Sequence, residues 1–110
     1  MGILKFQVLN EISTAIERMN KRNEEFDLPH VQVKSIWANY TFNLSEDLKD
    51  AKDLKLYLVF DDSSFVGDIE IGIMQELQDN SIIEELDLVI GFETTTSFLG
   101  KVSDTDIRLV

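Results

Sequence analysis

The first part of the chain places apolar side chains at the spacing of an α-helix. Intervals of three and four residues separate these positions, and charged side chains fall between them, which is typical of a helix with one buried face. The apolar positions are Leu4, Val8, Ile12, Ala15, Ile16 and Met19. We therefore predict an amphipathic helix from Leu4 to about Asn23. A second interpretation stays open, in which residues 3–9 form a strand and Asn10 caps a shorter helix.

Two central stretches alternate with the period of a β-strand. The first covers residues 36–44, where one face is apolar and the other is mainly polar. The mainly polar face carries Trp37, Asn39, Thr41 and Asn43. The second stretch, residues 54–60, is apolar on both sides and predicts a central strand covered on both faces. Residues 45–53 between them are charged, and we expect one helical turn there, capped by Ser45.

Residues 68–79 fit two patterns that periodicity alone does not separate. Isoleucines alternate around Gly72 as they do in a strand. A helix capped by Asp68 would instead align Ile69, Ile73, Met74 and Leu77. We favour a strand over residues 68–73, followed by a short helical turn.

The remaining elements are predicted to be short helical turns and strands. Ser81 and Glu84 have the spacing of a capping box, which predicts a brief helical turn. Alternating apolar and threonine positions over residues 86–98 then predict one long strand, because threonine favours extended backbone. Residues 106–110 are expected to form a final short strand.

These elements predict a single α+β domain that spans residues 1–110. In this fold the N-terminal amphipathic helix packs on a mostly antiparallel sheet of four or five strands, and short helical turns lie between the later strands. A chain of this length has room for one ordinary hydrophobic core.

Charge is distributed unevenly along the chain. Residues 1–44 are neutral, so residues 45–110 carry the whole net charge of −11. The stretch from Leu56 to Gly100 contains ten acidic residues and no Lys, Arg or His. Such a field repels nucleic acid and attracts basic surfaces. We therefore expect no direct binding of DNA or RNA.

Several other classes of protein lack support in the sequence. There is no cysteine, no signal-like N-terminus and no apolar run of membrane-spanning length, so we expect a soluble, cytoplasmic protein without a membrane partner. The single histidine, His30, has no nucleophile motif to serve and is expected in an exposed loop. Asp61, Asp62 and Asp68 lack the spacing of a calcium loop. We assign no catalytic, cofactor-binding or metal-binding residue.

Residues 53–89 resemble the later part of a small nucleotidyltransferase-type domain, in which a strand, a helical connection and a second acid-bearing strand follow one another. Activity in that family rests on a Gly-Ser pair followed by two metal-binding carboxylates one residue apart. Here the Gly-Ser pair is missing and Lys55 occupies the second carboxylate position. The resemblance therefore implies an inactive relative, and we transfer no catalytic role to Asp53 or Asp87.

The charge asymmetry favours a non-enzymatic module that binds a basic surface of another protein, such as a nucleic-acid-binding enzyme. An inhibitor, an immunity protein or a mimic of the phosphate backbone would act in this way. We expect Trp37 or Tyr57 to supply the apolar anchor. The predicted acidic contacts are Asp61, Asp62, Asp68, Glu70, Glu84, Glu85 and Glu93. Trp37 is expected to lie under the N-terminal helix, with exposure to a partner as the alternative.

Two other classes stay open. The acidity could serve solubility alone, in a structural subunit held by apolar contacts, and a homo-oligomer is compatible with the sequence. The acidic cluster could also serve a metal-dependent hydrolase or transferase.

Overall fold

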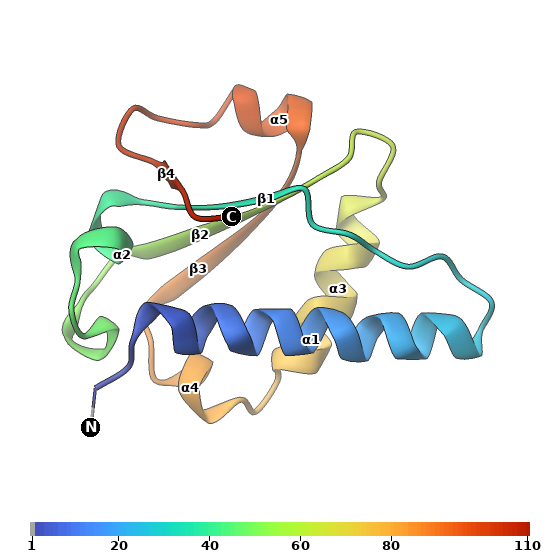
Figure 1. The fold of residues 1–110 in the computed structure, drawn as a ribbon, viewed down its shortest axis with the longest axis horizontal. Coiled ribbons are helices and arrows are strands. Elements are labelled where there is room, and N and C mark those ends of the chain that lie inside the picture. The colour runs from blue at the N-terminus through green and yellow to red at the C-terminus, as the bar shows by residue number, and fades with distance from the viewer. Residues whose placement is uncertain (1) are drawn as a thin grey trace.

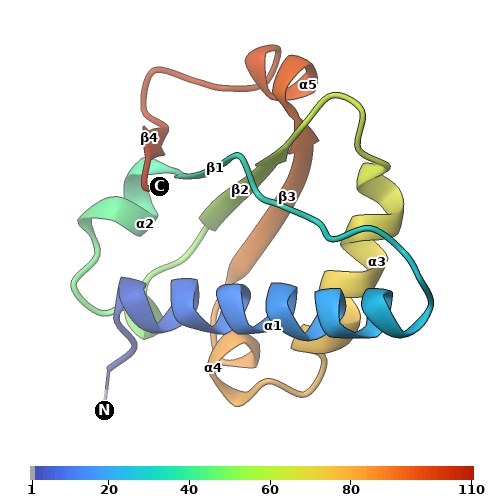
Figure 2. The same cartoon turned by 45° about the vertical axis from the view of Figure 1, so that its right-hand side comes forward.

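The computed structural model describes residues 2–110 and confirms the α+β class. A four-stranded sheet carries the long helix on one face, and further short helices lie between and after the strands (Figures 1 and 2). The elements are α1 (Lys5–Glu25), β1 (Ser35–Ala38), α2 (Tyr40–Leu44), the 3-10 helix η1 (Leu48–Asp50), β2 (Leu54–Phe60), α3 (Val66–Leu77), α4 (Ser81–Glu84), β3 (Leu88–Thr94), α5 (Thr95–Leu99) and β4 (Ile107–Arg108). Within residues 2–110, no helix combines the length and the apolar character needed to cross a membrane.

The sheet has the order β3-β2-β1-β4. β1 is antiparallel to β2 and to β4, whereas β2 and β3 are parallel. This arrangement agrees with the predicted sheet of four or five strands, and two of its three strand pairings are antiparallel. Because parallel neighbours need a crossover connection, α3 and α4 lie between β2 and β3. β2 is the predicted central strand, and side chains on both of its faces are buried.

Helix α1 confirms the predicted N-terminal helix, and the strand alternative for residues 3–9 is wrong. Its buried stripe consists of Val8, Ile12, Ala15 and Met19. These side chains join a core with alternate residues of β2, including Leu56 and Leu58, which are fully buried. The apolar stripe therefore determines which side of α1 faces the sheet.

The predicted strand over residues 36–44 ends early, at Ala38. Asn39 causes the change: its Oδ1 atom accepts a hydrogen bond from the Phe42 N–H at 3.1 Å, and so begins helix α2. Phe42 is still buried, but from a helix instead of a strand. Thr41 and Asn43 consequently do not share a strand face with Trp37, as the alternation had predicted.

The predicted strand over residues 68–73 is also wrong, and the helical alternative describes this segment. Helix α3 buries Ile69, Ile73 and Leu77. It begins after Phe65, so Asp68 lies in the first turn and is not the cap. The segment forms a helix because β2 and β3 are parallel and need a crossover connection between them. Its apolar residues, spaced four apart, bury one face of this helix against α1.

The predicted strand over residues 86–98 is wrong in its second half. β3 ends at Thr94, whose Oγ1 atom accepts a hydrogen bond from the Ser97 N–H at 3.1 Å, while the Thr94 N–H donates to Ser97 Oγ at 2.9 Å. This reciprocal cap begins α5, and its polar contacts override the β-propensity of the threonines.

The predicted helical turns within residues 45–53 and 81–84 are confirmed, as is a short final strand. Their caps differ from the expected serines. The Asp47 side chain accepts a hydrogen bond from the Lys49 N–H in η1, and Asn80 accepts from the N–H groups of Ile82 and Ile83 in α4. In each case a carboxylate or amide oxygen accepts hydrogen bonds from N–H groups of the turn that have no partner within it.

Candidate binding groove

A groove of about 810 Å³ opens at one end of the molecule. Its walls are the C-terminal part of α1, the connection after it, the loop after β2 and one side of α3 from Asp68 to Gln75. In Figure 1, α1 extends beyond the sheet, and the chain returns from its end towards β1. The groove is thus a consequence of a helix longer than the sheet that it covers.

Large apolar side chains around this groove are exposed to solvent. The exposed fractions are 73% for Phe26, 54% for Leu28, 79% for Phe65 and 65% for Ile71. They come from three separate segments of the chain, yet all of them line the groove. A concentration of exposed apolar groups in one place is typical of an interaction surface, whereas single exposed residues are common everywhere.

Polar contacts hold the connection that forms one wall. Asn20 on α1 accepts a hydrogen bond from the Val31 N–H at 2.7 Å and donates to the Val31 C=O at 3.0 Å. Asn23 accepts from the Leu28 N–H at 2.8 Å through its backbone, and its side chain donates to the Pro29 C=O at 3.2 Å. These hydrogen bonds therefore hold the connection after α1 against that helix in the absence of a partner.

Charges inside the groove compensate one another. Lys34 and Asp61 form an ion pair at 3.7 Å, and Arg22, which also lines the groove, lies 3.6 Å from Glu76 outside it. Asp68 is the fourth charged residue of the lining. Hydrogen bonds from the backbone and side chain of Ser63 lower the pKa of Asp61 below its ordinary value. The groove is thus close to neutral in a chain with a net charge of −11.

The structure distributes the predicted acidic contacts over several surfaces. Asp61 and Asp68 line the groove, and Glu70 is exposed on α3. Glu84 and Glu85 lie at the end of α4, where Glu85 pairs with Lys49 at 3.6 Å. These side chains therefore do not form one continuous patch.

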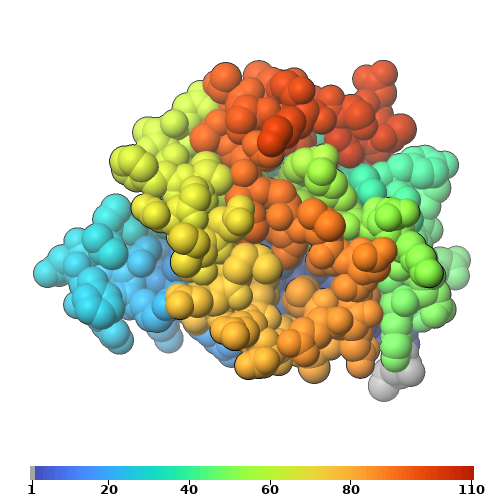
Figure 3. Space-filling view, turned by 180° about the vertical axis from the view of Figure 1, so that it is seen from behind, coloured from blue at the N-terminus to red at the C-terminus, as the bar shows by residue number. Residues whose placement is uncertain are grey.

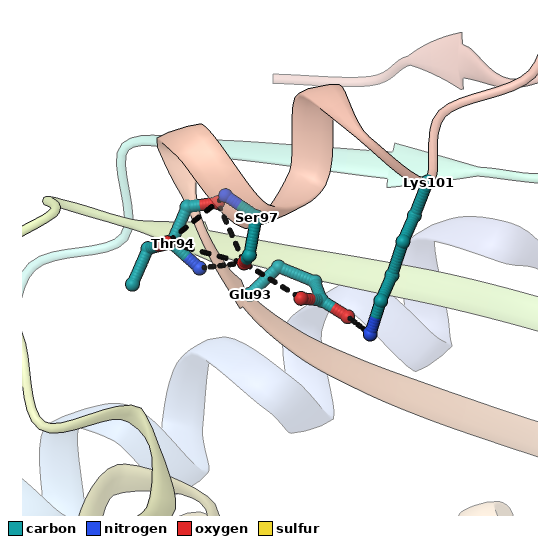
Figure 4. A network of polar contacts seen from close by, with 4 residues as sticks. All are labelled: Glu93, Thr94, Ser97 and Lys101. Carbon is teal, nitrogen blue, oxygen red and sulfur yellow. Dashed lines mark hydrogen bonds and ion pairs between the residues drawn. The ribbon is translucent and has the colours of Figure 1, made fainter.

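Asp62 and Glu93 instead hold α5 on the sheet. Asp62 accepts hydrogen bonds from the Thr96 N–H and hydroxyl, both at 2.8 Å, and these bonds lower its pKa. Glu93 accepts from Lys101 Nζ and Ser97 Oγ, both at 2.7 Å (Figure 4). Burial alone would raise the pKa of Glu93, but the hydrogen bonds from Lys101 and Ser97 offset it, so the pKa lies below its ordinary value.

The two predicted aromatic anchors pack beneath α5, on the face of the sheet opposite α1. The ring centroids of Trp37 and Tyr57 each lie 5.1 Å from that of Phe98, and Tyr57 is 7% exposed. Trp37 Nε1 donates to Ser35 Oγ at 3.0 Å, which satisfies its polar group internally. The expectation that the N-terminal helix covers Trp37 is wrong, because α5 does so.

Phe26 and Phe65 are the aromatic residues of the groove, and the sequence interpretation missed them. Each interrupts a polar segment: Phe26 stands between Glu25 and Asp27, and Phe65 follows two aspartates and two serines. Isolated aromatic residues in polar connections have no core to enter. An aromatic residue within a polar connection was therefore the sequence feature that could have indicated an exposed binding residue.

The segment that resembles a nucleotidyltransferase consists of β2, the helical crossover and β3. Asp53 and Asp87 lie together at one end of these strands, where the Asp53 N–H donates to Asp87 Oδ2 at 2.8 Å. Lys55 adjoins them and places its ammonium group 4.8 Å from the centroid of the Tyr57 ring. Within residues 2–110, no three His, Asp or Glu side chains come close enough together to hold a metal ion. An inactive relative stays a prediction.

His30 is exposed in the connection after α1, as expected, and lies 2.6 Å from Glu24. No protein-family model matches the chain, and neither the curated proteins nor the solved structures contain a significant match.

Proposed function

We propose that this chain is a non-enzymatic protein-binding module that receives apolar side chains of a basic partner in the groove. The observation that carries the proposal is the convergence of four exposed apolar residues on one preformed groove of about 810 Å³. Phenylalanine residues such as Phe26 and Phe65 are enriched at protein interfaces, and burial of their apolar area favours association.

The charge of the chain supports a basic partner. Long-range attraction depends on the net charge of −11, which brings a basic surface towards the molecule and speeds encounter. Acidic residues also border the groove, since Glu24, Glu25 and Asp27 adjoin Phe26. The charged side chains that line the groove, Arg22 and Lys34 against Asp61 and Asp68, balance one another, so no net charge opposes apolar contacts there.

Long-range attraction by acidic residues, combined with apolar contacts in the groove, fits an inhibitor, an immunity protein or a mimic of nucleic acid. The partner would then be a protein with a basic surface, such as a nucleic-acid-binding enzyme. The net negative charge, including the acidic residues that border the groove, would set the rate of association, and the apolar contacts in the groove would set the rate of dissociation.

Affinity capture with matched variants tests the proposal. The purified chain, Phe65→Ser and Leu99→Ser serve as bait in host lysate with nuclease present, each washed at low and at high salt. Leu99 is 69% exposed on α5, away from the groove, so Leu99→Ser is a control of similar exposure. We expect a basic partner that the unaltered chain and Leu99→Ser retain at low salt and that Phe65→Ser loses.

Other outcomes separate the alternatives. A partner that all three baits retain through high salt would favour a structural subunit and contradict the role of the groove. A chain that gains thermal stability from Mg²⁺, Ca²⁺ or Mn²⁺ would favour metal-dependent chemistry, since about a hundredfold excess over the dissociation constant adds roughly 2.7 kcal/mol.

A further inference from the structure

The sheet ends at β3, which has seven residues and no strand on its outer side within residues 2–110. Figure 2 shows this strand as one of the long members of the sheet, and in Figure 3 the orange part of the chain that contains it reaches the surface beside the yellow residues of α3. Val89, near the start of this edge, is 58% exposed. Leu88, Ile90 and Gly91 are half-buried, whereas Phe92 and Glu93 are buried. The first part of the outer side of β3, from Leu88 to Gly91, is therefore the part that is open to another chain.

The register determines which backbone groups face outwards. In a parallel pair, alternate residues of each strand form hydrogen bonds with the neighbour. The Leu54 N–H donates to the Asp87 C=O at 3.1 Å, and this bond sets the phase along β3. The N–H and C=O groups that point away from β2, and have no partner within residues 2–110, belong to Leu88, Ile90 and Phe92.

This edge lacks the usual protection against further pairing. Natural edge strands carry proline, lysine, a bulge or an inward-pointing charge. β3 contains no proline and no lysine, and its register with β2 runs without interruption from Leu88 to Thr94. Its one charged residue, Glu93, is already paired with Lys101 at 2.7 Å. The free backbone groups of Leu88 and Ile90 are consequently available to an extended segment.

Charge determines which kind of segment fits. The edge lies within the stretch from Leu56 to Gly100, which has ten acidic residues and no basic one, and Asp87 immediately precedes it. A second copy would bring two chains of net charge −11 together, which repulsion opposes. A basic segment would gain attraction instead.

We propose that an extended, basic segment of a partner protein adds to the sheet as a fifth strand beside β3. Backbone hydrogen bonds to Leu88 and Ile90 supply affinity, and the side chain of Val89 supplies an apolar contact. This surface is separate from the groove, so the inference does not depend on the proposed function.

Amide hydrogen exchange with a synthetic peptide tests the inference. The probe is a ten-residue peptide of alternating lysine and valine, titrated into the full chain labelled with ¹⁵N. At about 90% occupancy, exchange of the outward amides of Leu88 and Ile90 should slow about tenfold. The amides of Val89, Gly91 and Glu93 already face β2 and should change far less. Absence of this alternating pattern would overturn the proposal.

Modified peptides supply controls that leave the protein unaltered. N-methyl groups are placed on the lysine amides in one peptide and on the valine amides in another. In the register that places a valine beside Val89, only one set of amides faces β3, so one peptide should lose at least about tenfold in affinity and the other should bind as before. Equal affinity of both peptides would contradict strand addition.

Two further measurements test the charge requirement and the position of the bound peptide. A peptide with glutamate in place of lysine should not bind, and equal binding would contradict the charge requirement. The Ile71→Ser variant, altered in the groove, should bind the basic peptide normally; loss of binding would place the peptide in the groove and overturn the proposal. Alternating protection that increases with protein concentration in the absence of peptide would also overturn it, by identifying a second copy as the added strand.

Discussion

Helices α1 and α5 cover opposite faces of the same sheet, and different forces hold them there. α1 buries a stripe of four apolar residues over 21 residues of helix. α5 has five residues, buries Phe98 alone, and is fastened by the carboxylates of Asp62 and Glu93. Burial of apolar area over many turns can stabilise a helix without polar help, whereas a short helix needs its caps.

The same comparison explains the location of the groove. α1 is stable enough to extend beyond the sheet. Phe26, which follows its last residue, and the connection after it are exposed there. On the other face, polar contacts keep Trp37 and Tyr57 covered. Phe26 is therefore exposed at the C-terminal end of α1, whereas Trp37 and Tyr57 are covered by α5 on the other face.

The largest expected effect comes from the buried stripe of α1. Ile12 is fully buried between this helix and the sheet. Ile12→Ala should lower the free energy of unfolding by about 2–5 kcal/mol, because it removes apolar contacts and leaves a cavity. Urea denaturation followed by far-ultraviolet circular dichroism measures it. Ser13→Ala, on the exposed side of the same turn, should stay within about 0.5 kcal/mol, and equal losses for both would refute the assignment of the buried face.

A smaller loss is expected when α5 is released from the sheet. Glu93→Gln keeps the size of the side chain but removes the charge that Lys101 and Ser97 bind. Stability should fall by about 1–2 kcal/mol. Fluorescence of Trp37 should report the change, because its ring contacts Phe98 on α5. If stability and fluorescence were both unaltered, the polar attachment of α5 would be unimportant.

Acid should weaken the α5 side selectively. The pKa values of Asp62 and Glu93 are lowered in the folded chain, so their stabilising contribution is present above the ordinary values of 3.8 and 4.5. It is lost as the pH falls from those values through the lowered folded pKa values. The difference in stability between the unaltered chain and Glu93→Gln should therefore shrink below about pH 4. Denaturation series at pH 7 and pH 3 test this, and a constant difference would contradict it.

The smallest effect on stability is expected in the groove itself. Phe65 is 79% exposed, so Phe65→Ser removes little buried area and should change the free energy of unfolding by less than about 0.5 kcal/mol. Thermal or urea denaturation of this variant beside Ile12→Ala measures the contrast. A large loss of stability would show that Phe65 supports the fold, and would weaken its assignment to binding.

Long apolar patterns made α1, β2 and the fold class predictable from the sequence. The errors arose where a local polar contact or the sheet topology decided the outcome. Asn39 and Thr94 each end a run of alternating residues by capping a helix, and alternation alone does not register a cap. The segment around Ile69 forms a helix because β2 and β3 are parallel, a relation that only the assembled sheet defines.

The candidate site was harder to predict for a physical reason. Net charge indicated a basic partner but gave no position, because acidic residues recur along the whole second half of the chain. Trp37 was predicted as an anchor because of its size, yet its environment depends on α5. The β-propensity of Thr95 and Thr96 favoured a strand over this helix. The groove itself requires the end of α1 and the start of α3 to meet, and that contact is tertiary.

The most direct test of the groove is the affinity of the captured partner for three forms of the chain. Titration calorimetry would compare the unaltered chain, Phe65→Ser and Leu99→Ser at one salt concentration. We predict that Phe65→Ser loses at least about tenfold in affinity, or about 1.4 kcal/mol, while Leu99→Ser binds as the unaltered chain does. Equal affinity of all three forms would contradict the assignment of the groove as the binding site.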